Sequence, residues 1–193
     1  MLVESVVKER IMERLLAGAK AMRLGSGMEA DTAMGPLVSE SHRIKVAEEV
    51  EAGVEEGATI AAGGSAPEDE RLRGGYYYNP TIMDGVSHEM RVAKEEIFVP
   101  VLTVSTFETQ EEALMKANFV DYGLWAGVWT RNLGRAHAMA RDIEAGIVCI
   151  NEEPLTFPQT PFGGFKRSGN SSEQGMDAIS TYVRVKNVSV NLD

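Results

Sequence analysis

The first part of the chain carries apolar residues at helical spacing. They recur every three or four positions between residues 7 and 22, which is the period of one face of an α-helix. The stripe consists of Val7, Ile11, Leu15, Ala19 and Met22, widened by Met12 and Leu16. We therefore expect an amphipathic helix here that packs one face against the rest of the fold.

A second helix is indicated after the polar, glycine-containing stretch GSGMEADTAMGPLVSE. Ser39, near the end of this stretch, is a suitable N-cap, because a serine hydroxyl accepts a hydrogen bond from a free backbone N–H of the first turn. The apolar positions that follow predict an inner face made of Ile44, Ala47, Val50 and Val54.

Later segments alternate between strand-forming and helix-forming residues. β-Branched and aromatic residues predict strands in GATIAAGG, YYYNPTIM, VPVLTVSTF, LWAGVWT and IVCIN. Thr109 and Glu112 have capping-box spacing at the start of one intervening helix. Strands joined by helical crossovers pair in parallel. The pattern therefore predicts an α/β fold with a mainly parallel sheet flanked by helices.

The end of the chain is a long β-prone run, STYVRVKNVSVNL. We expect a C-terminal β-strand over residues 179–193, separate from a main domain over residues 1–178. An uncovered apolar strand edge favours pairing with another chain. The run therefore predicts an oligomerisation strand.

Composition excludes several classes of protein. The chain is 44% apolar and 25% charged, as globular domains are, with a formal net charge of −10. An acidic surface disfavours binding to nucleic acid and to anionic membranes. No apolar run is long enough to span a bilayer, and the N-terminus lacks a signal peptide's apolar stretch. A single cysteine cannot form an intramolecular disulfide, which favours a cytoplasmic protein.

Cys149 is the one cysteine, and its sequence context favours a structural role. It lies in the apolar segment IVCIN, with no Lys, Arg or His within five residues. A reactive thiolate needs a nearby cation or helix N-terminus. The three histidines are scattered without metal-ligand spacing, so no metal site is predicted.

Two segments each allow a structural and a functional interpretation. AKEEIFVP, residues 93–100, is either a solvated acidic turn before a strand or a carboxylate and ring placed to bind a ligand. The stretch EEPLTFPQTPFGGFKRSGN, residues 152–170, follows a strand, where α/β proteins place binding groups. It is either a binding loop or an ordered surface loop with buried anchors.

Taken together, these segments resemble the aldehyde dehydrogenase superfamily. AKEEIFVP is similar to the family motif K-E-E-I-F-G-P, and PFGGFKRSG to the motif P-F-G-G-x-K-x-S-G. MGPLVSE, EGATIAAGG, GGYYYNPTI, DYGLWAGVWT and AGIVCIN occur in the family's order and spacing. The resemblance implies a catalytic-domain α/β sheet, and a terminal strand that pairs with a neighbouring subunit.

The resemblance also implies a cofactor, NAD or NADP. Glu96 matches the family glutamate that hydrogen-bonds the nicotinamide ribose, and Phe98 matches the phenylalanine that packs near the nicotinamide. Val99 replaces the usual glycine of this motif, so the backbone beside the cofactor is expected to differ.

On the side of the aldehyde substrate, the resemblance implies a tunnel aromatic at Phe162 and a variable loop that Asn151 opens. The substrate-side residues are Asn151, Leu155, Thr156, Phe157 and Phe162. Glu173 matches a glutamate near the proton exit route of some members. Ser171 and Ser172 stand where the family usually has Gly-Arg, which weakens the assignment of Glu173.

In the family reaction a cysteine thiolate attacks the aldehyde, hydride passes to NAD(P), and a glutamate-activated water hydrolyses the thioester. The resemblance places the nucleophile, the general base and the nucleotide-binding half upstream of residue 1. The sequence is thus expected to be the C-terminal part of an enzyme that oxidises an aldehyde to a carboxylate, inactive by itself.

Three accounts of such a chain remain open. It is one chain of a split or nicked enzyme completed by an N-terminal-half chain, or it is a fragment. The third account is a non-catalytic, self-assembling module that forms a homo-oligomer through residues 179–193 and binds no cofactor.

Overall fold

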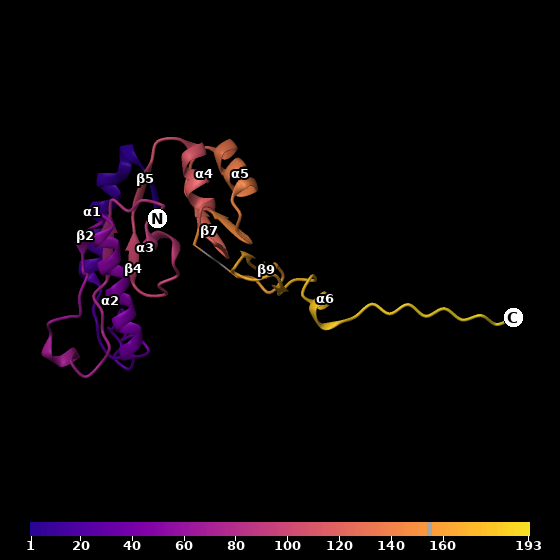
Figure 1. The fold of residues 1–193 in the computed structure, drawn as a ribbon, viewed down its shortest axis with the longest axis horizontal. Coiled ribbons are helices and arrows are strands. Elements are labelled where there is room, and N and C mark those ends of the chain that lie inside the picture. The colour runs from indigo at the N-terminus through magenta and orange to yellow at the C-terminus, as the bar shows by residue number, and fades with distance from the viewer. Residues whose placement is uncertain (154–155) are drawn as a thin grey trace. The chain divides into compact units, whose positions relative to one another are not determined.

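The computed structural model describes residues 1–153 and 156–193, and the chain divides into two compact units, Met1–Phe119 and Val120–Asp193 (Figure 1). The first unit contains β1 (Leu2–Glu4), the 3-10 helix η1 (Ser5–Val7), α1 (Lys8–Ala21), α2 (Glu40–Glu55), β2 (Thr59–Ala62), the 3-10 helix η2 (Glu70–Leu72), β3 (Thr81–Asp84), α3 (Arg91–Lys94), β4 (Val101–Thr103), β5 (Ser105–Phe107) and α4 (Gln110–Asn118). The second contains β6 (Tyr122–Gly123), β7 (Trp125–Val128), α5 (Leu133–Asp142), β8 (Ile147–Ile150), β9 (Phe162–Gly163), β10 (Phe165–Lys166), β11 (Ser172–Glu173) and α6 (Ile179–Tyr182).

The strands of the first unit pair mostly in parallel. β1 lies parallel to β5, and β4 lies parallel to β3, whose other edge pairs antiparallel with β2. The predicted apolar stripe of α1 packs on Val3, Ile82 and Val104, with Met12 buried among them. Met22, the last predicted position, lies beyond the helix and is 49% exposed. The prediction of an amphipathic first helix is therefore confirmed, because its apolar side chains cover these strands.

Helix α2 begins as predicted but buries a different face. The N–H of His42 donates to the Ser39 hydroxyl over 3.1 Å, so Ser39 is the N-cap. The predicted inner face is correct at Val50 and wrong at the other three positions, since Ile44 and Val54 are 51% and 43% exposed and Ala47 is also exposed. The buried face consists of Val46, Glu49, Val50 and Gly53. Tertiary contacts with β3 and α3 decide which side of the helix turns inward.

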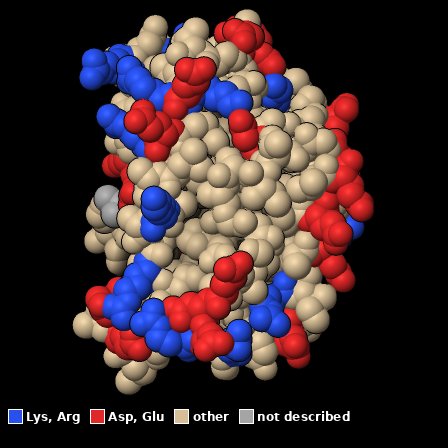
Figure 2. Space-filling model, turned by 90° about the vertical axis from the view of Figure 1, so that its left-hand side faces the viewer, with Lys and Arg blue, Asp and Glu red and all other residues tan. Residues whose placement is uncertain are grey.

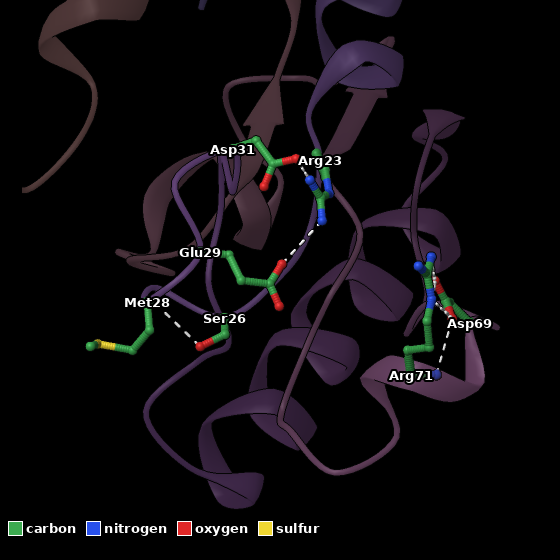
Figure 3. Close-up of polar contacts among 7 residues, drawn as sticks. All are labelled: Arg23, Ser26, Met28, Glu29, Asp31, Asp69 and Arg71. Carbon is green, nitrogen blue, oxygen red and sulfur yellow. Dashed lines mark hydrogen bonds and ion pairs between the residues drawn. The ribbon is translucent and has the colours of Figure 1, made fainter.

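Ion pairs shape the surface loops of the first unit (Figure 3). The guanidinium of Arg23 bonds Glu29 over 3.1 Å and pairs with Asp31, which closes the loop between α1 and α2. In η2 the side chain of Arg71 hydrogen-bonds Asp69 and holds the pKa of that carboxyl below its usual value. These contacts are exposed, so each contributes little to stability.

In the second unit β7, α5 and β8 form a crossover. β7 and β8 pair in parallel from Trp125 beside Ile147 to Val128 beside Ile150. The Asn132 side chain caps α5 by accepting from the N–H of Arg135 over 3.0 Å. The predicted strand–helix–strand order is confirmed here, and with it the α/β class. Short antiparallel pairs, β6 with β10 and β9 with β11, complete the regular structure described in this unit.

The terminal segment differs from the prediction at its start. Residues Ile179–Tyr182 form the helical turn α6, and the chain becomes extended at Val183 (Figure 1). No strand pairing is assigned to residues 183–193 of the single chain. A β-strand needs a hydrogen-bonded partner, and none is assigned to this segment within the single chain. Pairing of the segment with another chain therefore stays a prediction. The boundary at residue 178 also stays a prediction.

Apolar side chains are exposed on the first unit. Val6, Met28, Val38 and Phe98 are among the large apolar residues with most of their surface open to solvent. Figure 2 shows one face of the molecule with a largely uncharged middle, which has acidic and basic side chains above and below it and acidic side chains along its right-hand edge. Within the described residues, none of the helices is both long enough and apolar enough to cross a membrane.

Candidate functional site

The segment after α3 displays two of the predicted site residues. Helix α3 ends at Lys94, and Glu95 is extended with φ −81° and ψ 144°. Beyond it, burial alternates: Glu96 and Phe98 are exposed, whereas Ile97 and Val99 pack against the first unit's core. The inward anchors therefore present the Glu96 carboxylate and the Phe98 ring to solvent from the same short stretch.

Phe98 is exposed from an unusual backbone conformation. Its φ is +56°, in the left-handed region that non-glycine residues seldom adopt, and its side chain is 85% exposed. The strand that follows is fixed because the N–H of Thr81 donates to the carbonyl of Pro100 over 2.9 Å. An exposed apolar ring held in a strained turn is typical of a contact surface.

Asn151 ties the ends of two parallel strands together. It follows β8, and its φ is +56°. Its side-chain oxygen accepts from the N–H of Thr130, and its amide nitrogen donates to the Thr130 carbonyl, both over 2.8 Å. The amide thus orders the loops that leave the carboxyl ends of β7 and β8, where α/β proteins place binding groups.

The other substrate-side residues lie along the loop that follows. Thr156 and Phe157 are exposed, and the Phe157 carbonyl accepts from the N–H of Thr160 over 3.0 Å. Leu155 lies outside the described residues. Phe162, half-buried in β9, stands directly beside Glu173 of β11 in the antiparallel register. The structure therefore brings Phe162 and Glu173 together, as neighbours across one short ribbon.

Gly146, directly before β8, allows the PFGG stretch to pass close to the backbone there. A Cβ on Gly146 would lie 1.8 Å from the carbonyl oxygen of Gly163, which no side chain can accommodate. Farther along, the ammonium of Lys166 donates to the Val120 carbonyl over 3.1 Å and pairs with Glu144 over 2.6 Å. The close backbone contact between Gly146 and Gly163 and the two bonds of the Lys166 ammonium therefore hold the stretch in place.

Cys149 is buried in the core, as expected from its apolar context. Its side chain is 6% exposed in β8, and the indole N–H of Trp125 donates to its Sγ over 3.2 Å. Nowhere in the described chain do three or more His, Cys, Asp or Glu residues gather as metal ligands would.

Two residues next to the Glu96–Phe98 segment, Arg91 and Glu49, were not predicted from the sequence. Arg91 opens α3, and its guanidinium bonds the carboxylate of Glu49, which is buried in α2. The hydrogen bond to Glu49 raises the pKa of Arg91. The predicted face of α2 excluded Glu49, although the spacing of Val46, Glu49, Val50 and Gly53 is equally helical.

Comparison with known proteins identifies the family to which the chain belongs. The sequence pattern of the aldehyde dehydrogenase family matches residues 1–188. The chain belongs to the aldehyde dehydrogenase family. It is 41% identical over 191 residues to betaine aldehyde dehydrogenase of Bacillus subtilis, and 40% identical over 188 residues to that of Mesorhizobium japonicum. The match covers 99% of this chain and 39% of the length of the first relative.

Solved structures of the family show the same fold. A crystal structure of betaine aldehyde dehydrogenase from Staphylococcus aureus in complex with NAD+ aligns with a TM-score of 0.91 at 38% identity. The alignment covers 94% of this chain and 36% of that chain. The chain therefore corresponds to little more than a third of the length of these relatives.

Proposed function

We propose that this chain supplies the nicotinamide-contact and aldehyde-contact segments of an NAD-dependent aldehyde dehydrogenase, which oxidises an aldehyde to a carboxylate. Its strongest support is the alignment of 94% of the chain with an NAD+-bound family member. The exposed Glu96–Phe98 turn adds independent support, because it displays groups suited to a nicotinamide nucleoside.

On the cofactor side, the residues present fit NAD+. The exposed carboxylate of Glu96 accepts hydrogen bonds from ribose hydroxyls, and the exposed Phe98 ring provides a flat apolar surface for the nicotinamide. Bound NAD+ supplies the hydride acceptor for the oxidation. The task of this chain is to orient the nicotinamide, which makes the hydride transfer effectively intramolecular.

On the substrate side, the loop after β8 contacts the aldehyde. Phe157 and Phe162 provide apolar contact area, and Asn151 orders the start of the loop through Thr130. Thr156 is exposed in the same loop. Leu155 is assigned to the substrate side by the family resemblance alone. Glu173, beside Phe162 in the β9–β11 ribbon, provides a carboxylate for proton release.

The nucleophilic thiol and the general base come from the rest of the enzyme, contributed by an N-terminal-half chain or by a preceding segment. Cys149 is the one cysteine in the sequence, and its thiol is buried among strand residues. The reaction needs a thiolate that an aldehyde can reach. The assembled enzyme is expected to be cytoplasmic and oligomeric through the predicted segment 179–193, whose extended part begins at Val183.

Native mass spectrometry of the protein from its source, followed by denaturing mass analysis, tests the assembly. We expect a second, N-terminal-half polypeptide or a longer chain that contains this sequence. Aldehyde-dependent formation of NADH should accompany it, with betaine aldehyde and neutral aldehydes compared as substrates. Complexes made of this 193-residue chain alone, without turnover or NAD+ binding, would overturn the proposal.

A second candidate is the non-catalytic, self-assembling module. The extended apolar residues after Val183 favour it, since Val185, Val188, Val190 and Leu192 are all exposed. Exposed apolar runs invite pairing between chains. This account predicts a homo-oligomer that bears no cofactor, so the same mass measurement and an NAD+ titration separate the two proposals.

A further inference from the structure

A carboxylate is buried inside α2 without full hydrogen bonding. Glu49 is 2% exposed; its Oε1 accepts from the guanidinium of Arg91, and no partner for its Oε2 occurs among the described residues. Glutamate is almost never fully buried unless it is paired. A buried oxygen that lacks a hydrogen bond lowers stability, so its presence calls for a compensating role.

Stability does not explain the Glu49–Arg91 pair. The neighbours of Glu49 on the buried face of α2 are apolar, among them Val46 and Val50. A well-packed apolar side chain at such a position is often neutral or better, because desolvation of a buried carboxylate offsets its attraction to the partner. Arg91 is itself half-exposed, which screens that attraction further. What an ion pair adds, and an apolar contact lacks, is a fixed direction and position.

The pair anchors a helix that has little stability of its own. Helix α3 has four residues, far below the length at which a helix persists by itself. A second bond reinforces the anchor, because the backbone N–H of Arg91 donates to the Glu56 carboxylate over 2.7 Å. The next residue, Val92, is buried in the cluster that contains Val50. The first turn of α3 is therefore held to α2 by side chain, backbone and apolar packing.

The anchored helix leads directly into the Glu96–Phe98 turn. The chain leaves α3 after Lys94, so nothing but Glu95 separates the helix from the turn. Phe98 has its left-handed φ of +56° and an exposed ring, a conformation that persists only when the surrounding structure determines it. The position of α3 sets where both side chains point.

We propose that Arg91 and Glu49 are positioning residues for the cofactor contact: by fixing α3 on α2, they orient Glu96 and Phe98 toward the nicotinamide riboside. This inference rests on the proposed function of that turn. Neither Arg91 nor Glu49 needs to touch the cofactor. Arg91 uses one terminal nitrogen toward Glu49, so a lysine ammonium can replace it in part.

The test uses the assembled enzyme and a double variant, Glu49→Met with Arg91→Met. Removing both partners avoids an unpaired buried carboxylate, so the fold is retained. We expect the dissociation constant for NAD+, measured by calorimetry, to rise about tenfold, while the KM for the aldehyde stays within about twofold. Arg91→Lys should recover most of the NAD+ affinity. Arg43→Met removes a surface pair with Glu40 on the same helix and serves as the matched control, without effect.

Parallel variants separate failure of this inference from failure of the proposed function. Glu96→Gln and Phe98→Ala should each weaken NAD+ binding. If neither does, the cofactor contact itself is wrong, and the positioning inference falls with it. If both do while the double variant binds NAD+ normally, only the positioning inference is wrong. Equal loss of affinity for NAD+ and aldehyde together with a lower melting temperature would reduce the pair to a structural role and also refute it.

Discussion

Trp125 and Cys149 are joined by a hydrogen bond across the parallel strands β7 and β8. The indole N–H of Trp125 lies 3.2 Å from the Sγ of Cys149 and donates to it. The bond, the burial of the thiol and its place inside a strand all assign Cys149 to the core. A thiol in this position is a structural side chain, because a reactive thiolate sits in an accessible site beside a cation or a helix N-terminus.

Cys149→Ala should therefore leave the chemical step intact. We expect turnover per folded assembled enzyme within about twofold of the parent. The free energy of unfolding should fall by about 1 kcal/mol, because the smaller side chain leaves a void and frees the indole donor. Activity assays and chemical denaturation measure the two effects. Complete loss of the chemical step in a normally folded variant would contradict the structural role.

The N-cap of α2 is a second measurable feature. Ser39→Ala removes the acceptor for the N–H of His42 and should lower the free energy of unfolding by about 1 kcal/mol. Ser39→Asp keeps an acceptor at the same place and is the control. Equal destabilisation by both substitutions, seen in denaturant titrations, would mean that the loss does not come from the capping hydrogen bond.

Two glycines inside helices should respond in opposite directions to alanine. Apart from the local helix backbone, no heavy atom of the described residues lies within 4 Å of a Cβ built on Gly18 in α1, so Gly18→Ala should stabilise by about 0.5–1 kcal/mol. A Cβ on Gly53 in α2 would lie 2.7 Å from the Met83 Cε and 2.9 Å from the Val92 Cγ1. Gly53→Ala should destabilise by about 1–3 kcal/mol through overpacking. Thermal melts of the Gly18→Ala and Gly53→Ala variants measure both changes in stability. A stabilised Gly53→Ala protein would refute the close packing of α2 on α3.

Acid should weaken the start of α4. Glu112 pairs with Lys116 over 2.6 Å and accepts from the N–H of Glu108, and these bonds, the Lys116 bond first, lower its pKa from the ordinary 4.5. A lowered folded-state pKa stabilises the fold above the unfolded value, and this stability is lost as pH falls through the folded value.

Glu112→Gln should thus be less stable than the parent near neutrality, and the two should converge below pH 4.5. Melting temperatures across the acidic range measure the difference. Glu111→Gln removes a carboxylate from the same turn but leaves the Lys116 contact, so it controls for net charge. A difference in melting temperature between the parent and Glu112→Gln that persists unchanged in acid would contradict the stabilising role of the ionised Glu112 carboxylate.

Local patterns in the sequence were sufficient for several features. The stripe of α1, the caps at Ser39 and Thr109, the strands and helix of the β7–α5–β8 unit and the apolar context of Cys149 are all visible in neighbours within a few residues along the chain. The two motifs likewise located the Glu96–Phe98 turn and the Phe162 loop. Short-range spacing and hydrogen-bonding capacity are properties that a sequence displays directly.

Which face of α2 turns inward was decided by the tertiary structure alone. Two sets of positions on that helix have helical spacing, and the buried set contains a glutamate and a glycine. Glu49 is tolerated inside because Arg91 reaches it from α3, and Gly53 is required because Met83 and Val92 occupy the space of a side chain. These partners are tens of residues away along the chain. Periodicity identifies a helix, but the burial of one face is a property of the surfaces that meet it.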